Sequence, residues 1–261
     1  MHISLKNKTA LVGGSTGGIG KGIALQLAAS GASVTLMARD QNKLQTVLAQ
    51  LPREKGQEHG YLVVDFDDHA DFKRRIAHFF ETHRVSILVN NTQGPAAGNT
   101  LEKGTQHYQE AFDLLFKNVV LTTELALQQM QKDRWGRIIN VASVSVKEPL
   151  SYLALSNTIR AAVVTWAKSL ATDVGPYGIT VNSILTGYFD TDRIAQLNAA
   201  KAKQMKVPEE AVQREMEAKV PLGRMGQPGE YGYLAAFLAS DQAAYLTGTQ
   251  IPLDGGLLRS L

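Results

Sequence analysis

A glycine-rich turn between an apolar stretch and a helix is the feature that most constrains this chain. Residues 9–12 are largely apolar, GGSTGGIG follows, and apolar residues then recur at helical spacing as far as Gly31. Gly14, Gly18 and Gly20 form a G-x-x-x-G-x-G pattern. Backbone without side chains can turn tightly and approach a diphosphate, which the helix N-terminus then attracts. The stretch predicts a nucleotide-binding strand, turn and helix, and an ordinary glycine-rich turn is the alternative.

Short apolar stretches alternate with helical patterns along the rest of the chain. Strands are expected at 9–12, 33–38, 61–65, 86–90, 137–142, 179–185 and 250–253. After the first helix, further helices are expected at 41–51, 70–82, 105–131, 151–174 and 228–239. This alternation predicts an α/β fold, a Rossmann-like doubly wound parallel sheet of about seven strands with helices on both faces. We expect one domain over residues 1–261, with a substrate lid at about 188–220.

Composition excludes several classes of function. The net charge is only +3, without a dense basic run, so no nucleic-acid partner is expected. Cysteine is absent and the six histidines show no metal-ligand spacing, so no metal site is expected. The N-terminus lacks the apolar core of a signal peptide, and no apolar run reaches the roughly 18 residues that span a membrane. We therefore expect a cytoplasmic protein without a membrane partner.

The end of the second predicted strand bears on which dinucleotide would bind. In such folds an acidic residue about 20 residues beyond the glycines bonds the adenosine ribose. Here the strand ends in Ala38, Arg39 and Asp40. A guanidinium suits a 2′-phosphate through paired hydrogen bonds, so the sequence favours NADP(H). NAD(H) remains possible if Arg39 is only a solvated charge and Asp40 turns toward the ribose.

Motifs spread over the whole chain resemble those of the short-chain dehydrogenase/reductase family, especially its 3-oxoacyl-carrier-protein-reductase-like branch. GGSTGGIG resembles the family's TGxxxGIG, and NNTQG resembles NNAG. IINVAS, ITVNSILTG and the tail from RMGQPGE to LDGG resemble the strand with the catalytic serine, the ITVNxxxPG segment and the C-terminal pattern. The resemblance implies an oxidoreductase that moves a hydride between a nicotinamide cofactor and a small carbonyl or alcohol substrate.

The family's catalytic set is Asn, Ser, Tyr and Lys, and only its first half is present. Asn118 and Ser143 match the asparagine and the serine. Counting forward from Ser143 and back from Asn182 leads to Ser156 for the tyrosine, and hence to Arg160 for the lysine. None of the eight tyrosines has a lysine four residues after it. Because a serine is a far weaker acid than a phenol and an arginine cannot release a proton, the family mechanism cannot run unchanged.

Three interpretations of this replacement stay open. The chain could be an NADP(H)-dependent oxidoreductase in which Ser143 and Asn118 position the substrate or a water and Arg160 stabilises oxyanion charge. A water, Tyr152 or Tyr188 would then donate the proton. It could instead bind a nucleotide without turnover, as a sensor or partner subunit, or be a structural paralogue in a mixed oligomer. The joint change to serine and arginine favours the first interpretation, since a decaying site more often loses its charge.

The resemblance also implies cofactor contacts and an assembly. Relatives commonly form tetramers through two long helices and the last strand, so a homotetramer or homodimer is expected. The lid carries Lys201, Lys203 and Lys206, which would suit an acidic substrate unless they are simply a solvated helix face. The cofactor contacts implied are Gly14, Ser15, Thr16, Gly18, Ile19, Gly20, Arg39, Asp65, Phe66, Asn91, Gly94, Arg160, Gly187 and Thr191.

Overall fold

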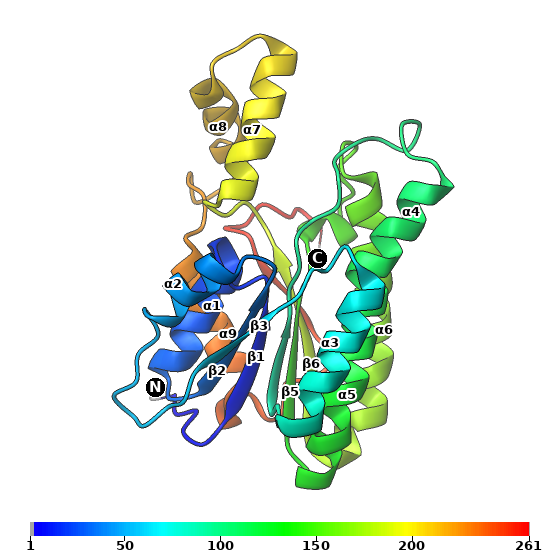
Figure 1. Cartoon of the computed structure of the whole chain (residues 1–261). Helices are drawn as coiled ribbons and strands as arrows, with labels where there is room; N and C mark the ends of the chain where they lie inside the picture. The colour runs from blue at the N-terminus through cyan, green and yellow to red at the C-terminus, as the bar shows by residue number, and fades with distance from the viewer. Residues whose placement is uncertain (1–2, 261) are drawn as a thin grey trace.

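A seven-stranded parallel sheet lies at the centre of the computed structural model, which describes residues 3–260 (Figure 1). The strand order is β3-β2-β1-β4-β5-β6-β7, which confirms the predicted fold class. Every predicted strand is present, although β3 is shorter than expected. The strands are β1 (Thr9–Gly13), β2 (Ser33–Ala38), β3 (Gly60–Val63), β4 (Ile87–Asn90), β5 (Gly136–Val141), β6 (Ile179–Thr186) and β7 (Gln250–Leu253).

Helices cover both faces of this sheet, as predicted. One face carries α1 (Gly18–Ala29), α2 (Gln41–Leu48) and α9 (Pro228–Leu238), which close over a core of small and branched apolar residues. The other face carries α3 (His69–Thr82), α4 (Thr105–Phe112), α5 (Asn118–Asp133) and α6 (Ala154–Val174). Every residue of β4 and β5 is buried, as expected for parallel strands covered on both sides.

The strand order reverses direction at β1, which lies between β2 and β4. In open parallel sheets, a crevice forms at this point beyond the carboxyl ends of the strands. The glycine-rich turn follows β1, and the loop of residues 91–95 follows β4. The two loops most expected to hold a nucleotide therefore meet at the edge of the sheet.

The long helix predicted at 105–131 is not continuous. A π-helical segment, η1 (Asp113–Lys117), separates α4 from α5. Its Leu114 and Leu115 are buried, so the apolar stripe continues through the segment and hides the change of winding from the sequence pattern. Extra residues in a helical turn rotate everything that follows, and such π segments often lie at functional sites. Here the segment ends immediately before Asn118.

The predicted lid consists of two helices that project from the carboxyl edge of the sheet, α7 (Asp192–Met205) and α8 (Glu209–Glu217) (Figure 1). The Glu215 carboxylate accepts hydrogen bonds from Lys201 at 3.0 Å and Lys219 at 2.7 Å, and so joins the two helices. At least Lys201 is therefore part of an ion pair within the lid. Among residues 3–260, no helix is long and apolar enough to cross a membrane.

Candidate active site

The glycine-rich turn forms a cradle that is closed on its inner side and open on its outer side. Gly14 and Gly18 have φ angles of +56° and +47°, which favour glycine. A side-chain carbon on Gly20 would lie 2.2 Å from the Gly14 carbonyl oxygen, so the turn and α1 pack backbone against backbone. A side chain on Gly17 would meet nothing within 4 Å. This open face, at the start of α1, fits a diphosphate group.

Ser15 was predicted to contact the cofactor, but the structure turns it inward. Its hydroxyl accepts a hydrogen bond from Met37 N–H at 2.9 Å, and its own N–H points to the Met37 carbonyl oxygen at 3.4 Å. The side chain is fully buried and holds the turn against β2. Thr16 and Ile19 are only partly buried and remain available to a ligand.

Arg39 follows the last residue of β2, and its acidic neighbour Asp40 is engaged by the next helix. The Asp40 carboxylate accepts the Lys43 N–H at 3.0 Å and caps α2. Asp40 therefore does not turn toward a ribose. Arg39 is exposed and lies 3.9 Å from the Asp67 carboxylate, a long contact that a phosphate can replace.

The cofactor contacts predicted after β3 and after β4 lie around the same crevice. Most of their polar groups form hydrogen bonds within the protein that hold these loops together. The Asn91 amide donates to the Gly13 carbonyl oxygen at 2.9 Å, which joins the loop after β4 to the cradle. The Asp65 carboxylate accepts the Asp67 N–H at 3.0 Å. Phe66 is buried, and Gly94 faces the lid, where a side-chain carbon would lie 3.7 Å from Arg193.

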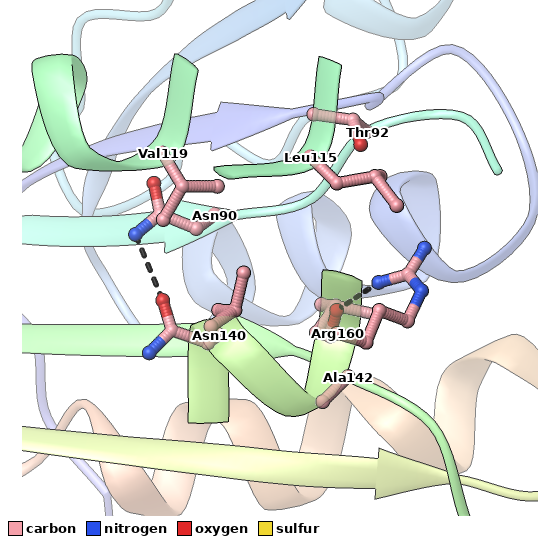
Figure 2. A pocket seen from close by; sticks show the side chains of 9 residues that line it. Asn90, Thr92, Leu115, Val119, Asn140, Ala142 and Arg160 are labelled. Carbon is pink, nitrogen blue, oxygen red and sulfur yellow. Dashed lines mark hydrogen bonds between the residues drawn. The ribbon is translucent and has the colours of Figure 1, made fainter. Parts of the chain in front are cut away.

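Arg160 links Ser156 to the end of β5, two residues before Ser143. The Ser143 hydroxyl accepts the Ser145 N–H at 3.1 Å, and among residues 3–260 no acceptor takes its own proton. Arg160 donates to the Ser156 hydroxyl at 3.2 Å. It also donates to the Val141 carbonyl oxygen at 2.5 Å (Figure 2). Desolvation by burial lowers the pKa of Arg160, although the guanidinium stays charged. The cluster thus offers a hydroxyl donor and a fixed cation.

Asn118 was predicted to position the substrate, but its side chain is 1% exposed and points elsewhere. Its amide donates to the Phe66 carbonyl oxygen at 2.8 Å, and its oxygen lies 2.6 Å from the His69 ring. It therefore ties the start of α5 to the connection between β3 and α3. The π-helical segment turns the Asn118 side chain away from the pocket and leaves Leu115 and Val119 to line it.

A small pocket lies between the ends of β4 and β5, with Arg160 at its rim (Figure 2). Asn90 bridges Thr123 at 3.1 Å and Asn140 at 2.9 Å inside it. The amide nitrogen of Asn140 has no hydrogen-bond partner among residues 3–260, although the residue is 1% exposed. An unpaired buried donor facing a pocket indicates a polar occupant there.

The turn after β6 positions the start of the lid. Gly187 packs on Asp254, since a side-chain carbon would lie 2.5 Å from the Asp254 Cα. Thr191 caps α7 by accepting the Ile194 N–H at 3.4 Å. Its methyl group would lie 3.0 Å from a side-chain carbon on Gly18, so the lid begins against the cradle.

The comparisons with known proteins agree with this geometry. A family model described as enoyl-(acyl carrier protein) reductase matches residues 14–258. Oxidoreductase UcpA of Salmonella typhimurium is 37% identical, over 97% of this chain and 95% of its own. The 3-oxoacyl-(acyl-carrier-protein) reductase of Pseudomonas aeruginosa is 32% identical, over 99% and 100%. This chain belongs to the short-chain dehydrogenase/reductase family of oxidoreductases.

A solved member of the family has closely the same fold. The crystal structure of L-sorbose reductase from Gluconobacter frateurii, in complex with NADPH and L-sorbose, superposes with a TM-score of 0.92. The two chains cover each other completely at 27% identity.

Two tyrosines that the sequence named as candidates lie near each other beside the crevice. Tyr152 lies in the turn before α6, and Tyr188 follows the Gly187 turn. Partial burial raises the pKa of Tyr152 to about 12, and the neighbouring Tyr188 shifts it in the same direction. The two phenols are therefore close enough to influence each other.

Proposed function

We propose that this protein is an NADP(H)-dependent oxidoreductase that interconverts a small carbonyl compound and its alcohol. The cofactor assignment rests on the different roles of Asp40 and Arg39 at the end of β2. Asp40 is committed to capping α2, and Arg39 is left as the charge that faces the ribose position. A guanidinium there favours a 2′-phosphate and an acidic side chain would oppose it. The complex of L-sorbose reductase with NADPH supports the same assignment.

The chain's own residues would hold the cofactor along the crevice. The open face of the cradle would take the diphosphate, and Thr16, Ile19, Asn91 and Gly94 border its path. When bound, the nicotinamide cofactor supplies or accepts the hydride. Arg160 would hold ribose hydroxyls, because its guanidinium keeps donors beyond those used by Ser156 and Val141.

Ser143 and Arg160 would act on the oxygen of the carbonyl group. Ser143 follows the end of β5, where Arg160 is anchored to the Val141 carbonyl oxygen two residues earlier. Donors and positive charge aimed at a developing alkoxide lower the barrier for hydride addition to the carbonyl carbon. Neither side chain has to lose a proton to do this.

The proton would come from Tyr188. Tyr188 follows the Gly187 turn at the crevice, and Tyr152 lies near enough to act on it electrostatically. After Tyr188 gives its proton to the alkoxide oxygen, Tyr152 would pass one back to it. Tyr152 is 42% exposed and can recover its own proton from water. The hydride and one water-derived proton thereby convert the carbonyl into the alcohol and balance the reaction.

The test is single-turnover reduction with bound NADPH across a panel of small ketones. Tyr188→Phe should lower the rate of hydride transfer by about 10² to 10⁴, the usual contribution of a positioned acid. Tyr152→Phe should lower it less and should leave NADPH binding unchanged. Tyr233→Phe, at an exposed position on α9, is the matched control and should have no effect.

The outcomes separate the interpretations. Unchanged rates in Tyr188→Phe would exclude the tyrosine pair and leave the oxidoreductase assignment in place. Tight NADPH binding without oxidation across the whole panel would instead support a nucleotide-binding protein that has lost turnover. We also propose a homotetramer or homodimer built on the long helices, which sedimentation of the full chain would test.

A further inference from the structure

Arg193, in the first turn of the lid helix α7, lies against the loop that follows β4. Its Nη2 donates to the Pro95 carbonyl oxygen at 2.9 Å. A side-chain carbon on Gly94 would lie 3.7 Å from the same nitrogen. The guanidinium therefore reaches across the crevice from the lid to the loop predicted to pass the cofactor.

A second guanidinium borders the same loop from the other side. Arg160 lines the pocket that Thr92 also lines, three residues before Pro95. Partial desolvation lowers the pKa of Arg193, and the charge of Arg193 contributes to the lowered pKa of Arg160. The two cations thus act on each other across residues 92–95.

Neither cation has an acidic partner. Among residues 3–260, no carboxylate lies within ion-pair distance of Arg160 or Arg193, whereas Arg39, Arg74, Arg75, Arg137 and Arg224 each have one. The groups that do accept from them are neutral: carbonyl oxygens and one serine hydroxyl. Partly desolvated cations that repel each other and keep free donors bind an anion favourably.

We propose that Arg193 is an anion-binding residue of the active site and that, with Arg160, it takes a phosphate or carboxylate group of a bound ligand. The Pro95 carbonyl occupies one of its donors in the free protein, and an oxyanion would replace or join it. Two sources have this chemistry: the diphosphate of a dinucleotide and the acidic group of a carbonyl substrate. The substrate arm rests on the function proposed above, whereas the binding arm does not.

The binding arm uses calorimetric titration of the full chain with NADPH and, separately, with inorganic pyrophosphate. If the anion is the cofactor diphosphate, Arg193→Met should weaken both by about tenfold, and Arg193→Lys by less. Arg214→Met is the matched control, since it makes the same change in the same lid. Among residues 3–260, the Arg214 side chain donates only to the Glu210 carbonyl oxygen of its own helix.

The substrate arm compares a 2-oxo acid with its methyl ester at saturating NADPH. If the anion is the substrate's, Arg193→Met should raise KM for the acid about tenfold and leave both KM for the ester and the Kd of NADPH unchanged. Changes below twofold in every measurement would overturn the proposal while leaving the reductase assignment intact. If the wild-type chain bound no NADPH, the reductase assignment would fail. Pyrophosphate binding that is equal in wild type and Arg193→Met would then overturn the present proposal by itself.

Discussion

Arg160 donates from Nε to the Ser156 hydroxyl at 3.2 Å, one helical turn earlier on α6. Residues four apart share a helix face, so the two side chains act as one unit. The guanidinium also reaches Val141 at the end of β5, which fixes it across the edge of the sheet. A fixed cation therefore lies beside the Ser156 hydroxyl in the first turns of α6.

Two replacements of Arg160 should distinguish how much its positive charge and its hydrogen-bond geometry each contribute to the rate of hydride transfer. Arg160→Met leaves the Val141 carbonyl oxygen and the Ser156 hydroxyl without their donor. Hydrogen bonds from a charged group contribute about 1.5–3 kcal/mol, so hydride transfer should fall by roughly 10- to 100-fold. Arg160→Lys keeps the charge and should lose less. Lys168→Met, at an exposed position on the same helix, is the control. Single-turnover rates that do not change in Arg160→Met would show that the guanidinium does not contact the reacting groups.

Replacing Arg39 should change the binding of the cofactor, whereas replacing Asp40 should change the stability of the protein. Arg39→Asp should weaken NADPH binding at least about tenfold and should improve NADH binding, because a carboxylate repels a 2′-phosphate. Asp40→Ala should leave this preference unchanged and cost about 0.5–2 kcal/mol of stability through loss of the α2 cap. Fluorescence titration with both cofactors and denaturant unfolding measure the two effects. An unchanged preference in Arg39→Asp would contradict the assignment of Arg39.

Asn118 should behave as a positioning residue. Asn118→Ala leaves the buried Phe66 carbonyl oxygen unpaired, which costs about 1–3 kcal/mol. A double-mutant cycle with His69→Ala should show coupling, since the two side chains share a hydrogen bond of 2.6 Å. Denaturant unfolding of the four proteins gives the coupling energy. If hydride transfer collapsed in Asn118→Ala while stability and coupling stayed at wild-type values, Asn118 would contact the substrate after all.

The sequence predicted every strand of the sheet because each is a short apolar stretch closed by polar or glycine residues. It could not predict the π-helical segment, since Leu114 and Leu115 keep the apolar stripe that an α-helix would also show. For a related reason the sequence could not predict that Ser15 and Asn118 bond to the protein's own backbone. A motif fixes where a residue stands along the chain, whereas its hydrogen-bond partners come from distant segments.

The sequence also placed Ser156 and Arg160 on one face of a helix, and the hydrogen bond between them agrees with that placement. It missed His69 and Arg193. His69 meets Asn118 across 49 residues and Arg193 meets Pro95 across 98, so no local pattern marks either contact. Tyr152 and Tyr188 were candidates from the sequence, but their proximity depends on how the turn before α6 faces the Gly187 turn.

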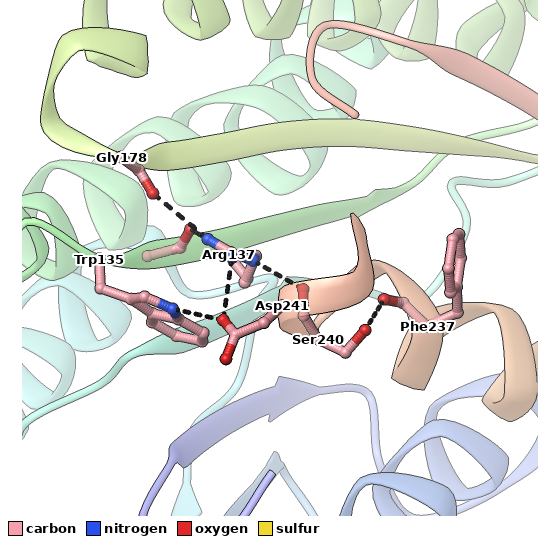
Figure 3. Close-up of polar contacts among 7 residues, drawn as sticks. Trp135, Arg137, Gly178, Phe237, Ser240 and Asp241 are labelled. Carbon is pink, nitrogen blue, oxygen red and sulfur yellow. Dashed lines mark hydrogen bonds and ion pairs between the residues drawn. The ribbon is translucent and has the colours of Figure 1, made fainter. Parts of the chain in front are cut away.

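Arg137 should stabilise the edge of the sheet opposite the crevice (Figure 3). Its side chain is 2% exposed and donates to the carbonyl oxygens of Gly136, Gly178 and Ser240. Arg137→Met leaves these acceptors unpaired and should cost about 2–3 kcal/mol, by the usual cost of unpaired buried groups. Asp241→Asn should cost less than about 1 kcal/mol, because this partner is largely exposed. Equal losses in denaturant unfolding would contradict this division.

Glu215 should hold the two lid helices together in a manner that depends on salt and pH. Hydrogen bonds from Lys219 and Lys201 lower the pKa of Glu215 to about 2 from an ordinary value of 4.5. A lowered carboxylate pKa stabilises the folded lid fully above pH 4.5, and this contribution disappears as the pH falls toward 2. Hydrogen exchange at pH 7 should therefore be faster in α7 and α8 of Glu215→Gln than in wild type.

The control for the lid is Glu217→Gln, because within residues 3–260 the Glu217 carboxylate accepts a hydrogen bond only from Gln213 of its own helix. It should leave α7 unchanged. Since the Glu215 pairs are exposed, high salt should screen them and bring wild type close to Glu215→Gln. In wild type, lowering the pH from 7 to 5 should leave α7 protection intact once the intrinsic exchange rates are corrected for pH. A marked loss of protection over that interval would mean that another group, with a higher pKa, joins the two helices.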